Sequence, residues 1–373
     1  MVNTTQRLFL LAAEPSGDVL GQAIISGLKQ RYPLLRYCGV GGPLMESAGN
    51  FTSIIPLSEL SVMGVVSIIK RLPFLVRSAH CIKKAITTTC PTALLTIDAP
   101  ELSLRISQSI RGIPRIHTVA PSVWAWRPKR AHALRRQTDH LLTLFPFENA
   151  YFPHVPSTWV GHPVADQPPG SADAFWSKHG PRQPMVCLLP GSRTSEIKRL
   201  LPVFLESAQR LKRHCPPLRV VLVCPQSARW LMDSVPDDIL IISDEKEKNN
   251  VFAAATVAIA ASGTVTLELA RHKTSMVVGY RISSLSWHLA RRLVTLSHVC
   301  LLNILADHPF VPECLQDDCC PDNIVPQVLS LLNNTAQRHN QIQTSSDLIT
   351  SLGCPHSTFS QRCAQHIGAI AGL

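Results

Sequence analysis

Several common signatures are missing from this sequence. No G-x-G-x-x-G follows the first apolar run, and no G-x-x-x-x-G-K-S/T occurs anywhere in the chain. These glycine patterns mark dinucleotide-binding folds and P-loop nucleotide sites, so dehydrogenases and P-loop enzymes lose most of their support. No C-x-x-C occurs either, and the group of Cys314, Cys319 and Cys320 beside His308 matches no standard zinc spacing. We therefore expect no bound metal.

Long apolar segments are also scarce. The apolar stretch before Glu14 has about six residues, too few for a secretory signal peptide. The longest uncharged run, 249–267, contains Ser, Thr and Gly residues that favour a strand, a turn and a helix start over a membrane span. We therefore expect a cytoplasmic protein without a spanning helix, whose twelve cysteines form no disulfide framework and are mostly buried thiols.

Acidic residues are outnumbered by basic ones. Lys and Arg total 36 against 25 Asp and Glu, which gives a formal net charge of +11. Such an excess favours anionic partners: nucleic acid, nucleotide phosphates or acidic lipid surfaces. Hydrophobic residues make up 45% and charged residues 16% of the 373 positions, a globular composition in a chain long enough for two domains.

Short apolar runs alternate with helical patterns along most of the chain. In the first half the predicted strands cover 7–13, 36–42, 93–97, 115–126 and 140–147. The alternation loosens in a Pro- and Gly-rich stretch at 161–184 and then resumes, with predicted strands at 185–190, 219–225, 239–244, 257–262 and 275–280. Strands that alternate with helices in this way are typical of βαβ units and predict parallel sheets.

This pattern predicts an α/β protein with two similar domains. We expect an N-terminal domain at 1–165, a linker at 166–184, a C-terminal domain at 185–335, and C-terminal helices at 336–373, for which the sequence leaves open whether they pack back on the first domain. Two such halves would leave a cleft between them, which is a common position for ligand sites.

Two glycine turns follow strands of the predicted second domain. In "LLPGSRTSEI" (188–197) the backbone N–H groups of the turn, the following helix dipole, Ser192 and Arg193 could hold a diphosphate. In "ASGTVTLELA" (261–270), Ser262, Gly263 and Thr264 open a helix that suits a phosphate, and Glu268 could accept both hydroxyls of a ribose. The competing interpretation of each is an ordinary βα turn with solvated charges.

Two acidic turns follow strands of the predicted first domain. "AAEPSGDVLG" (12–21) crowds polar groups into one turn that could cap a helix or bind a polar acceptor; they are Glu14, Ser16, Gly17 and Asp18. In "TIDAPE" (96–101), Asp98 and Glu101 have nearly the spacing of a capping box. Asp98 would also lie at the carboxyl end of a buried strand, where α/β sheets bind ligands. Local spacing leaves both interpretations open.

Two basic segments have surface character. "WAWRPKRAHALRR" (124–136) interleaves aromatic and basic residues, a composition that suits nucleic acid or anionic lipid but that more often forms a solvated helix face. "SVMGVVSIIKRLPFLVR" (61–77) is apolar with a basic end, as in interfacial helices, although part of it could simply be core. The membrane-facing candidates within it are Val62, Met63, Val65, Val66, Ile69, Lys70 and Arg71.

Taken in order, these segments resemble the lipid-A-disaccharide synthases. The matching blocks run from residue 8 to about 321 and include "AAEPSGDVLG", "GVGGPLMESAG", "ELSVMG", "IDAPE", "IHTVAPSVWAWRPKR", "LFPFE", "GHPVAD", "LLPGSR", "ASGTVTLE", "MVVGYR" and "VPECLQDDCCP". The resemblance implies a GT-B glycosyltransferase, with two Rossmann-like domains whose parallel sheets face a central cleft. It also implies an enzyme at the cytoplasmic face of the inner membrane of a Gram-negative bacterium.

The same resemblance implies a reaction and its residues. The family transfers 2,3-diacylglucosamine from its UDP derivative to 2,3-diacylglucosamine 1-phosphate, forming a β-1,6 disaccharide and UDP. The presumed catalytic aspartate falls on Asp98 and the essential arginine on Arg193; the donor-site glutamate and asparagine fall on Glu268 and Asn303. Asp98 would be the base, Arg193 would stabilise the leaving diphosphate and Glu268 would bind the ribose, so no cofactor is needed.

The chain departs from the family pattern at Ala13, Pro15, Glu101, Ser103 and Leu302, which puts the acyl-chain preference and rate in doubt. We expect an anionic membrane surface and the two lipid sugars as partners, and no nucleic acid; a homodimer stays open. The alternatives are another GT-B UDP-sugar enzyme, either an epimerase or a transferase with a soluble acceptor, and a non-enzymatic protein that binds anionic lipid or RNA.

Overall fold

The chain folds into two compact units. The structure is a computed structural model that describes residues 6–60, 65–125, 128–226, 228, 234–283 and 297–373, with the backbone alone for 65–70. Unit 1 comprises Met1–Asp166 and Leu352–Leu373, and unit 2 comprises Gln167–Ser351. Each unit is built on its own sheet, so the α/β architecture with parallel sheets that the alternating pattern predicted is confirmed.

Unit 1 is built on a six-stranded parallel sheet in the order β2-β1-β3-β4-β5-β6. Its strands are β1 (Arg7–Ala12), β2 (Arg36–Val40), β3 (Ala93–Ile97), β4 (Arg115–Thr118), β5 (His140–Thr143) and β6 (Ser157–Trp159). The near-continuous apolar sequences of β1 and β3 follow from burial on both faces. The helices are α1 (Pro15–Arg31), α2 (Pro43–Gly49), α3 (Leu57–Leu60), α4 (Val65–Thr89), α5 (Pro100–Ser107), α6 (Arg130–Leu134) and α15 (Phe359–Ala371), with 3-10 turns η1 (Glu148–Tyr151) and η2 (Pro163–Asp166).

Unit 2 repeats this plan with the strand order β12-β11-β10-β7-β8-β9, again all parallel. Its strands are β7 (Met185–Leu189), β8 (Arg219–Val223), β9 (Leu240–Ile242), β10 (Val257–Ala260), β11 (Ser275–Tyr280) and β12 (Glu313–Leu315). The helices are α7 (Ala172–His179), α8 (Thr194–His214), α9 (Glu245–Ala254), α10 (Val265–Arg271), α12 (Leu301–Ala306), α13 (Pro321–Asn333) and α14 (Thr335–Ser351), with the 3-10 turn η4 (Gln316–Asp318). The apolar face of α8 packs over this sheet and forms much of its core.

Each of the ten predicted strands has a counterpart, and the described residues contain two further strands that no apolar run predicted. Both missed strands, β6 and β12, are three residues long and lie at sheet edges, where the apolar signal is weakest. The predicted strand at 115–126 is too long, because β4 ends at Thr118. Val119 then adopts a φ of 76°, which breaks the extended backbone.

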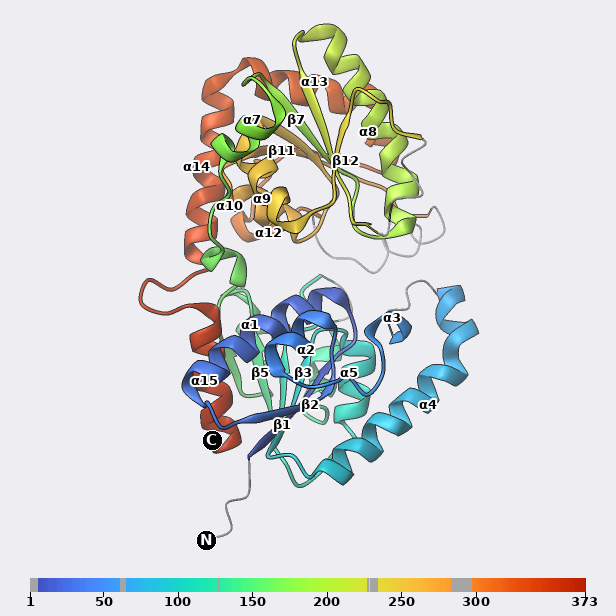
Figure 1. Cartoon of the computed structure of the whole chain (residues 1–373), viewed down its shortest axis with the longest axis vertical. Helices are drawn as coiled ribbons and strands as arrows, with labels where there is room; N and C mark the ends of the chain where they lie inside the picture. Colours follow the sequence, from blue (N-terminus) through green and yellow to red (C-terminus); the bar gives the residue numbers. More distant parts are fainter. Residues whose placement is uncertain (1–5, 61–64, 126–127, 227, 229–233, 284–296) are drawn as a thin grey trace. The chain divides into compact units, whose positions relative to one another are not determined.

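The last two helices, grouped together in the sequence analysis, belong to different units. Helix α14 lies in unit 2, whereas α15 lies in unit 1, where it runs beside α1 (Figure 1). Two glycines allow this close approach: a Cβ on Gly27 would collide with the backbone of Ser360, and one on Gly368 with the ring of Tyr32. The C-terminal segment is therefore an integral layer of the first unit.

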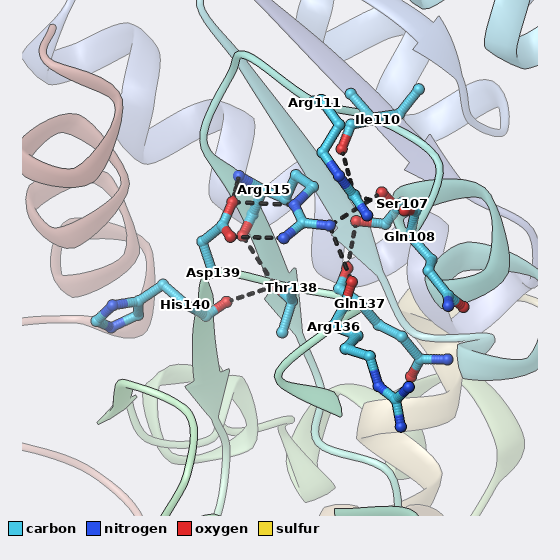
Figure 2. A network of polar contacts seen from close by, with 10 residues as sticks. All are labelled: Ser107, Gln108, Ile110, Arg111, Arg115, Arg136, Gln137, Thr138, Asp139 and His140. Atoms are coloured by element: carbon cyan, nitrogen blue, oxygen red, sulfur yellow. Dashed lines mark hydrogen bonds and ion pairs between the residues drawn. The ribbon is translucent and has the colours of Figure 1, made fainter. Parts of the chain in front are cut away.

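A polar network ties the amino-terminal ends of β4 and β5 together (Figure 2). Arg115 donates to Asp139 through Nε at 3.0 Å and Nη2 at 2.6 Å, and its Nη1 donates to the carbonyl of Arg136 at 3.1 Å. Thr138 Oγ1 donates to the carbonyls of Arg115 and His140. The network lies at the opposite end of these strands from Val119, so it stabilises the sheet away from the candidate site.

The predicted interfacial segment is only partly described. Val62 and Met63 lie outside the described residues, and the side chains of Val65, Val66, Ile69 and Lys70 do as well. Arg71 Nη1 donates to the carbonyl of Glu59 at 3.2 Å, and Leu72 and Val76 on the same helix are 52% and 61% exposed. Among the described helices, none has both the length and the hydropathy required to cross a bilayer.

Candidate functional site

Asp98 lies directly after β3 in an uncommon backbone conformation. Asp98 and Ala99 have φ values of 56° and 45°, which turn the chain sharply into α5. The backbone N–H of Asp98 donates to the carbonyl of Thr118 in β4 at 3.0 Å. Its Oδ2 accepts from Ser16 Oγ at 2.6 Å and its Oδ1 from the Ala99 N–H at 2.8 Å. The half-buried carboxylate is therefore held in one orientation at the carboxyl edge of the sheet.

The capping-box interpretation of Asp98 and Glu101 is wrong. Helix α5 has Ala99 at its N-cap and no side-chain capping bond. Glu101 turns instead to Arg130, with Oε1 2.7 Å from Nη1, and its side chain is 60% exposed. The two acids that looked equivalent in the sequence therefore have different partners and different environments.

In the turn at 12–21, Ser16 contacts Asp98 and Asp18 does not. A Cβ on Gly17 would lie 3.1 Å from the carbonyl oxygen of Ile97, so glycine permits the first turn of α1 to approach the end of β3. Ser16 then bonds Asp98. Asp18 is buried and accepts from backbone N–H groups at the start of α2, those of Gly42, Leu44 and Met45, at 2.9, 3.1 and 2.9 Å. Asp18 is thus a cap between helices; Glu14 occupies the N-cap position of α1.

In unit 2 the Pro-Gly-Ser-Arg turn leads from β7 into α8. Gly191 has a φ of 101°, which favours glycine, and a Cβ there would lie 2.6 Å from Oε2 of Glu196. Arg193 is the N-cap residue and makes no side-chain capping bond; its Nη1 lies 2.8 Å from Oε1 of Glu196. Ser192 and Arg193 are exposed beside the amino terminus of a 21-residue helix, an arrangement suited to an anion.

The Ser-Gly-Thr turn follows β10 in the same sheet. Ser262 Oγ donates to the carbonyl of Val299 at 2.6 Å, which ties this turn to the segment before α12. Gly263 has a φ of 153° and its missing Cβ would meet no atom within 4 Å. Thr264 is exposed at the start of α10, and Glu268 follows one turn later. The turn thus presents open backbone and a hydroxyl near a carboxylate.

Glu268 has a partner that no sequence motif predicted. Its Oε2 lies 3.0 Å from Nζ of Lys248, which comes from α9. The side chains of Glu268 and Lys248 are only 22% and 20% exposed. No pattern in the sequence links these residues, because they lie on different helices.

Asn303 is completely buried and its amide is fully used. Its Nδ2 donates to the carbonyl of Val311 at 2.9 Å and to Oε1 of Glu313 at 2.8 Å. Its Oδ1 accepts from the N–H groups of Phe310 and Val311 at 3.1 and 2.9 Å. Glu313 also caps α12 by accepting from the N–H of Cys300 at 3.0 Å. Asn303 therefore organises the 299–313 segment from within.

A buried acid not assigned a role from the sequence lies at the carboxyl end of β5. Glu148, in the "LFPFE" block, is 3% exposed and accepts from the N–H groups of Leu144 and Phe145. Nε1 of Trp124 donates to its other oxygen at 3.4 Å. Burial raises the pKa of Glu148 to about 7, although these hydrogen bonds act in the opposite direction. Glu148 thus joins the segment after β4 to the end of β5.

The cysteines near His308 do not gather into a ligand set in the structure. Cys314 and Cys319 are buried, and burial raises the pKa of each thiol to about 11, so both are protonated at neutral pH. Within the described ranges, no group of three or more His, Cys, Asp and Glu side chains could hold a metal ion.

The chain is similar over nearly its whole length to a known family. A family model described as lipid-A-disaccharide synthetase matches residues 8–367. The lipid-A-disaccharide synthase of Rhodospirillum centenum is 39% identical over 375 residues, covering 96% of this chain and 93% of the relative. That of Granulibacter bethesdensis is 38% identical over 373 residues, covering 95% and 94%.

The solved structures show the same fold at low identity. The S. aureus MnaA-UDP co-structure has a TM-score of 0.67 at 12% identity, covering 99% of this chain and 97% of that one. A likeness at this identity shows the fold alone, whereas the match along 8–367 and the 39% identity show the family. The chain therefore belongs to the lipid-A-disaccharide synthase family, and it is a glycosyltransferase of lipid A biosynthesis with the GT-B fold.

Proposed function

We propose that the protein transfers 2,3-diacylglucosamine from its UDP derivative to 2,3-diacylglucosamine 1-phosphate, with inversion, to form the β-1,6 disaccharide 1-phosphate and UDP. The observation that carries this proposal is the state of Asp98 in a chain of this family. Its carboxylate is half-buried, fixed by Ser16 and the Ala99 N–H, and placed at the carboxyl edge of the sheet. A base for the acceptor hydroxyl needs this kind of fixed orientation.

Asp98 is the base of the proposed reaction. It removes the proton of the acceptor 6-hydroxyl as that oxygen attacks the anomeric carbon, and the bond to the UDP oxygen breaks. Ser16 donates to Oδ2 and leaves the second lone pair of that oxygen for the acceptor. Glu14 and Gly17, in the same turn, border the acceptor. Asp18 does not contact it and instead bonds the turn to the start of α2.

The donor is held by two turns of unit 2. Arg193, Ser192 and the amino terminus of α8 bind the diphosphate and stabilise the charge that grows on it as the bond breaks. The turn of Ser262, Gly263 and Thr264 contributes open backbone near the nucleotide, and Glu268 accepts the ribose hydroxyls.

Asn303 contributes to the donor site indirectly. All of its hydrogen-bonding groups are used within the 299–313 segment, and that segment is bonded to Ser262 through the carbonyl of Val299. This network supports a positioning role for Asn303, rather than direct contact with the nucleotide.

Both substrates carry acyl chains, so the enzyme must work at a membrane surface. The net charge of +11 favours anionic lipid and the acceptor phosphate, and Leu72 and Val76 of α4 are exposed apolar side chains. The segment 61–77 is thus the proposed contact with the cytoplasmic face of the inner membrane.

A UDP-release assay with the two lipid monosaccharides in mixed micelles tests the proposal. Asp98→Asn should keep UDP affinity and lose nearly all turnover, because the amide cannot accept the proton. Asp347→Asn makes the same charge change on an exposed turn of α14 and should retain turnover. Near-normal turnover by the Asp98 variant would remove it as the base.

The diphosphate role has its own test. Arg193→Ala should weaken UDP binding about 10-fold or more, since charge-assisted bonds to phosphate are lost. Arg213→Ala, at the exposed far end of the same helix, is the control. Release of UDP without the lipid acceptor, or turnover that is independent of micelles, would instead favour another UDP-sugar enzyme of this fold.

A further inference from the structure

We propose that Lys248 is a positioning residue for the nucleotide donor: it holds the Glu268 carboxylate in the orientation that accepts the ribose 2′- and 3′-hydroxyls. The inference rests on the proposed function, in which Glu268 contacts the ribose. It adds a residue from α9 that no sequence motif indicated.

The contact is short and shielded. Nζ of Lys248 lies 3.0 Å from Oε2 of Glu268 and 2.7 Å from Oε2 of Glu245. The Lys248 and Glu268 side chains are about four-fifths buried, whereas Glu245 is 82% exposed. In the described part of the chain, no other cation forms an ion pair with Glu268. A pair shielded in this way is screened less than a surface pair, so its geometry persists.

Lys248 is charged in this setting. Burial acts to lower its pKa, but the carboxylates of Glu268 and Glu245 outweigh burial and the pKa lies above its ordinary value. An ammonium group at one carboxylate oxygen removes the rotational freedom of that carboxylate. The two hydroxyls of a cis-diol lie side by side and donate to the two oxygens of one carboxylate, which must therefore be correctly oriented. A carboxylate that is already fixed loses less entropy when the ribose binds.

Helix α9 is anchored independently of Glu268, so it can serve as a support. Asp244 caps it by accepting from the N–H groups of Lys246 and Glu247 at 2.7 and 3.0 Å. Glu247 bonds Lys178 at 2.8 Å and His179 at 2.6 Å, both at the end of α7. The position of Lys248 is therefore set by these contacts before any nucleotide binds.

The test compares the dissociation constants of UDP and 2′-deoxy-UDP by titration calorimetry. One hydrogen bond from the 2′-hydroxyl to a carboxylate changes a dissociation constant about 10-fold or more. The protein should therefore prefer UDP over 2′-deoxy-UDP by about 10-fold. Lys248→Met should reduce this preference to about 2-fold, because Glu268 is no longer oriented, and Lys248→Arg should restore most of it.

Two variants on the same helix are matched controls. Lys246→Met removes one positive charge from an exposed side chain of α9 and should leave the preference unchanged. Glu247→Gln weakens the attachment of α9 to α7 without touching the pair. If Glu247→Gln reduced the preference as much as Lys248→Met, a general loosening of α9 would explain the effect and the proposal would be overturned.

Glu268→Gln separates this inference from the proposed function. If Glu268→Gln leaves the UDP preference intact, Glu268 does not bind the ribose and the proposed donor role fails. If Glu268→Gln abolishes the preference but Lys248→Met does not, the donor role stands and the inference about Lys248 is refuted. Equal weakening of both nucleotides in Lys248→Met, with an unchanged ratio, also refutes it.

Discussion

Replacing Glu148 by glutamine should change how the stability of unit 1 depends on pH. The carboxyl group is 3% exposed; Oε2 accepts from the N–H groups of Leu144 at 2.9 Å and Phe145 at 3.0 Å, and Trp124 Nε1 reaches Oε1. Glutamine keeps the size of the side chain and one acceptor oxygen, but it cannot ionise. The perturbation therefore removes one titrating group from the core with little change of volume.

The magnitude follows from the pKa. Burial raises the pKa of Glu148 from 4.5 to about 7, a difference of about 2.5, which corresponds to roughly 3 kcal/mol. The folded protein holds this proton more tightly than the unfolded chain does. The contribution of the protonated Glu148 to the free energy of unfolding is therefore complete below pH 4.5, decreases as the pH rises, and is lost above pH 7.

Two buried histidines act with the opposite sign. Burial lowers the pKa of His117 to about 3 and that of His162 to about 4, so folding is destabilised as the pH falls below 6.5. Both histidines are present in the parent and the variant, and their contributions cancel in the difference between the two proteins. Only that difference isolates Glu148.

The assay is a urea titration at pH 5, 6, 7 and 8, read by a short proteolysis pulse and mass spectrometry of unit 1 peptides. The free energy of unfolding of Glu148→Gln, minus that of the parent, should increase by roughly 2 to 3 kcal/mol from pH 5 to pH 8. Any constant cost of facing an amide toward Trp124 shifts this difference without changing its slope. A difference that stays flat with pH would show that Glu148 titrates normally and refute the reasoning.

Two further predictions concern unit 1. Arg115→Met should lower its free energy of unfolding by about 2 to 3 kcal/mol, since Asp139 loses both guanidinium donors and keeps only the backbone N–H of residue 115, and the Arg136 carbonyl loses its bond to Nη1; the half-exposed Asp139 reduces the cost below that of a fully buried pair. The arginine holds the pKa of Asp139 below its usual value, so this loss, measured by urea titration, should shrink as the pH falls below 3.8. Ser103→Ala should be neutral or stabilise by about 1 kcal/mol, because within the described residues its buried hydroxyl has no hydrogen-bond partner; a clear loss in thermal melts would contradict this.

Local patterns in the sequence predicted the parts of the fold that depend on short stretches. The apolar runs at 7–13 and 93–97 became buried parallel strands, because burial on both faces requires continuous apolar residues. The segment 188–197, which contains the Pro-Gly-Ser-Arg motif, forms the end of a strand, a tight turn and the start of a helix next to Arg193. The order of the motif blocks was sufficient to indicate the family, which the match over 8–367 shows.

The roles of individual polar residues could not be predicted in the same way. Asp18 and Asp98 are both acids next to glycine- or proline-containing turns, yet Asp18 is buried and caps α2, whereas Asp98 is half-buried and held by Ser16. Glu101 matched a capping pattern, but its carboxylate reaches Arg130, 29 positions along the chain. Asn303, assigned to the donor by resemblance, uses its amide within its own segment.

Sequence patterns were thus enough to predict two α/β units with parallel sheets and to indicate the family, because periodicity and turn chemistry act over a few neighbouring residues. The environment of each carboxylate depends on the assembled fold: Ser16 fixes Asp98, the core buries Glu148, and Lys248 pairs with Glu268. Burial and charge pairing depend on groups brought together from distant positions. The environment of a carboxyl group, and therefore its chemistry, appears only when the strands and helices are assembled.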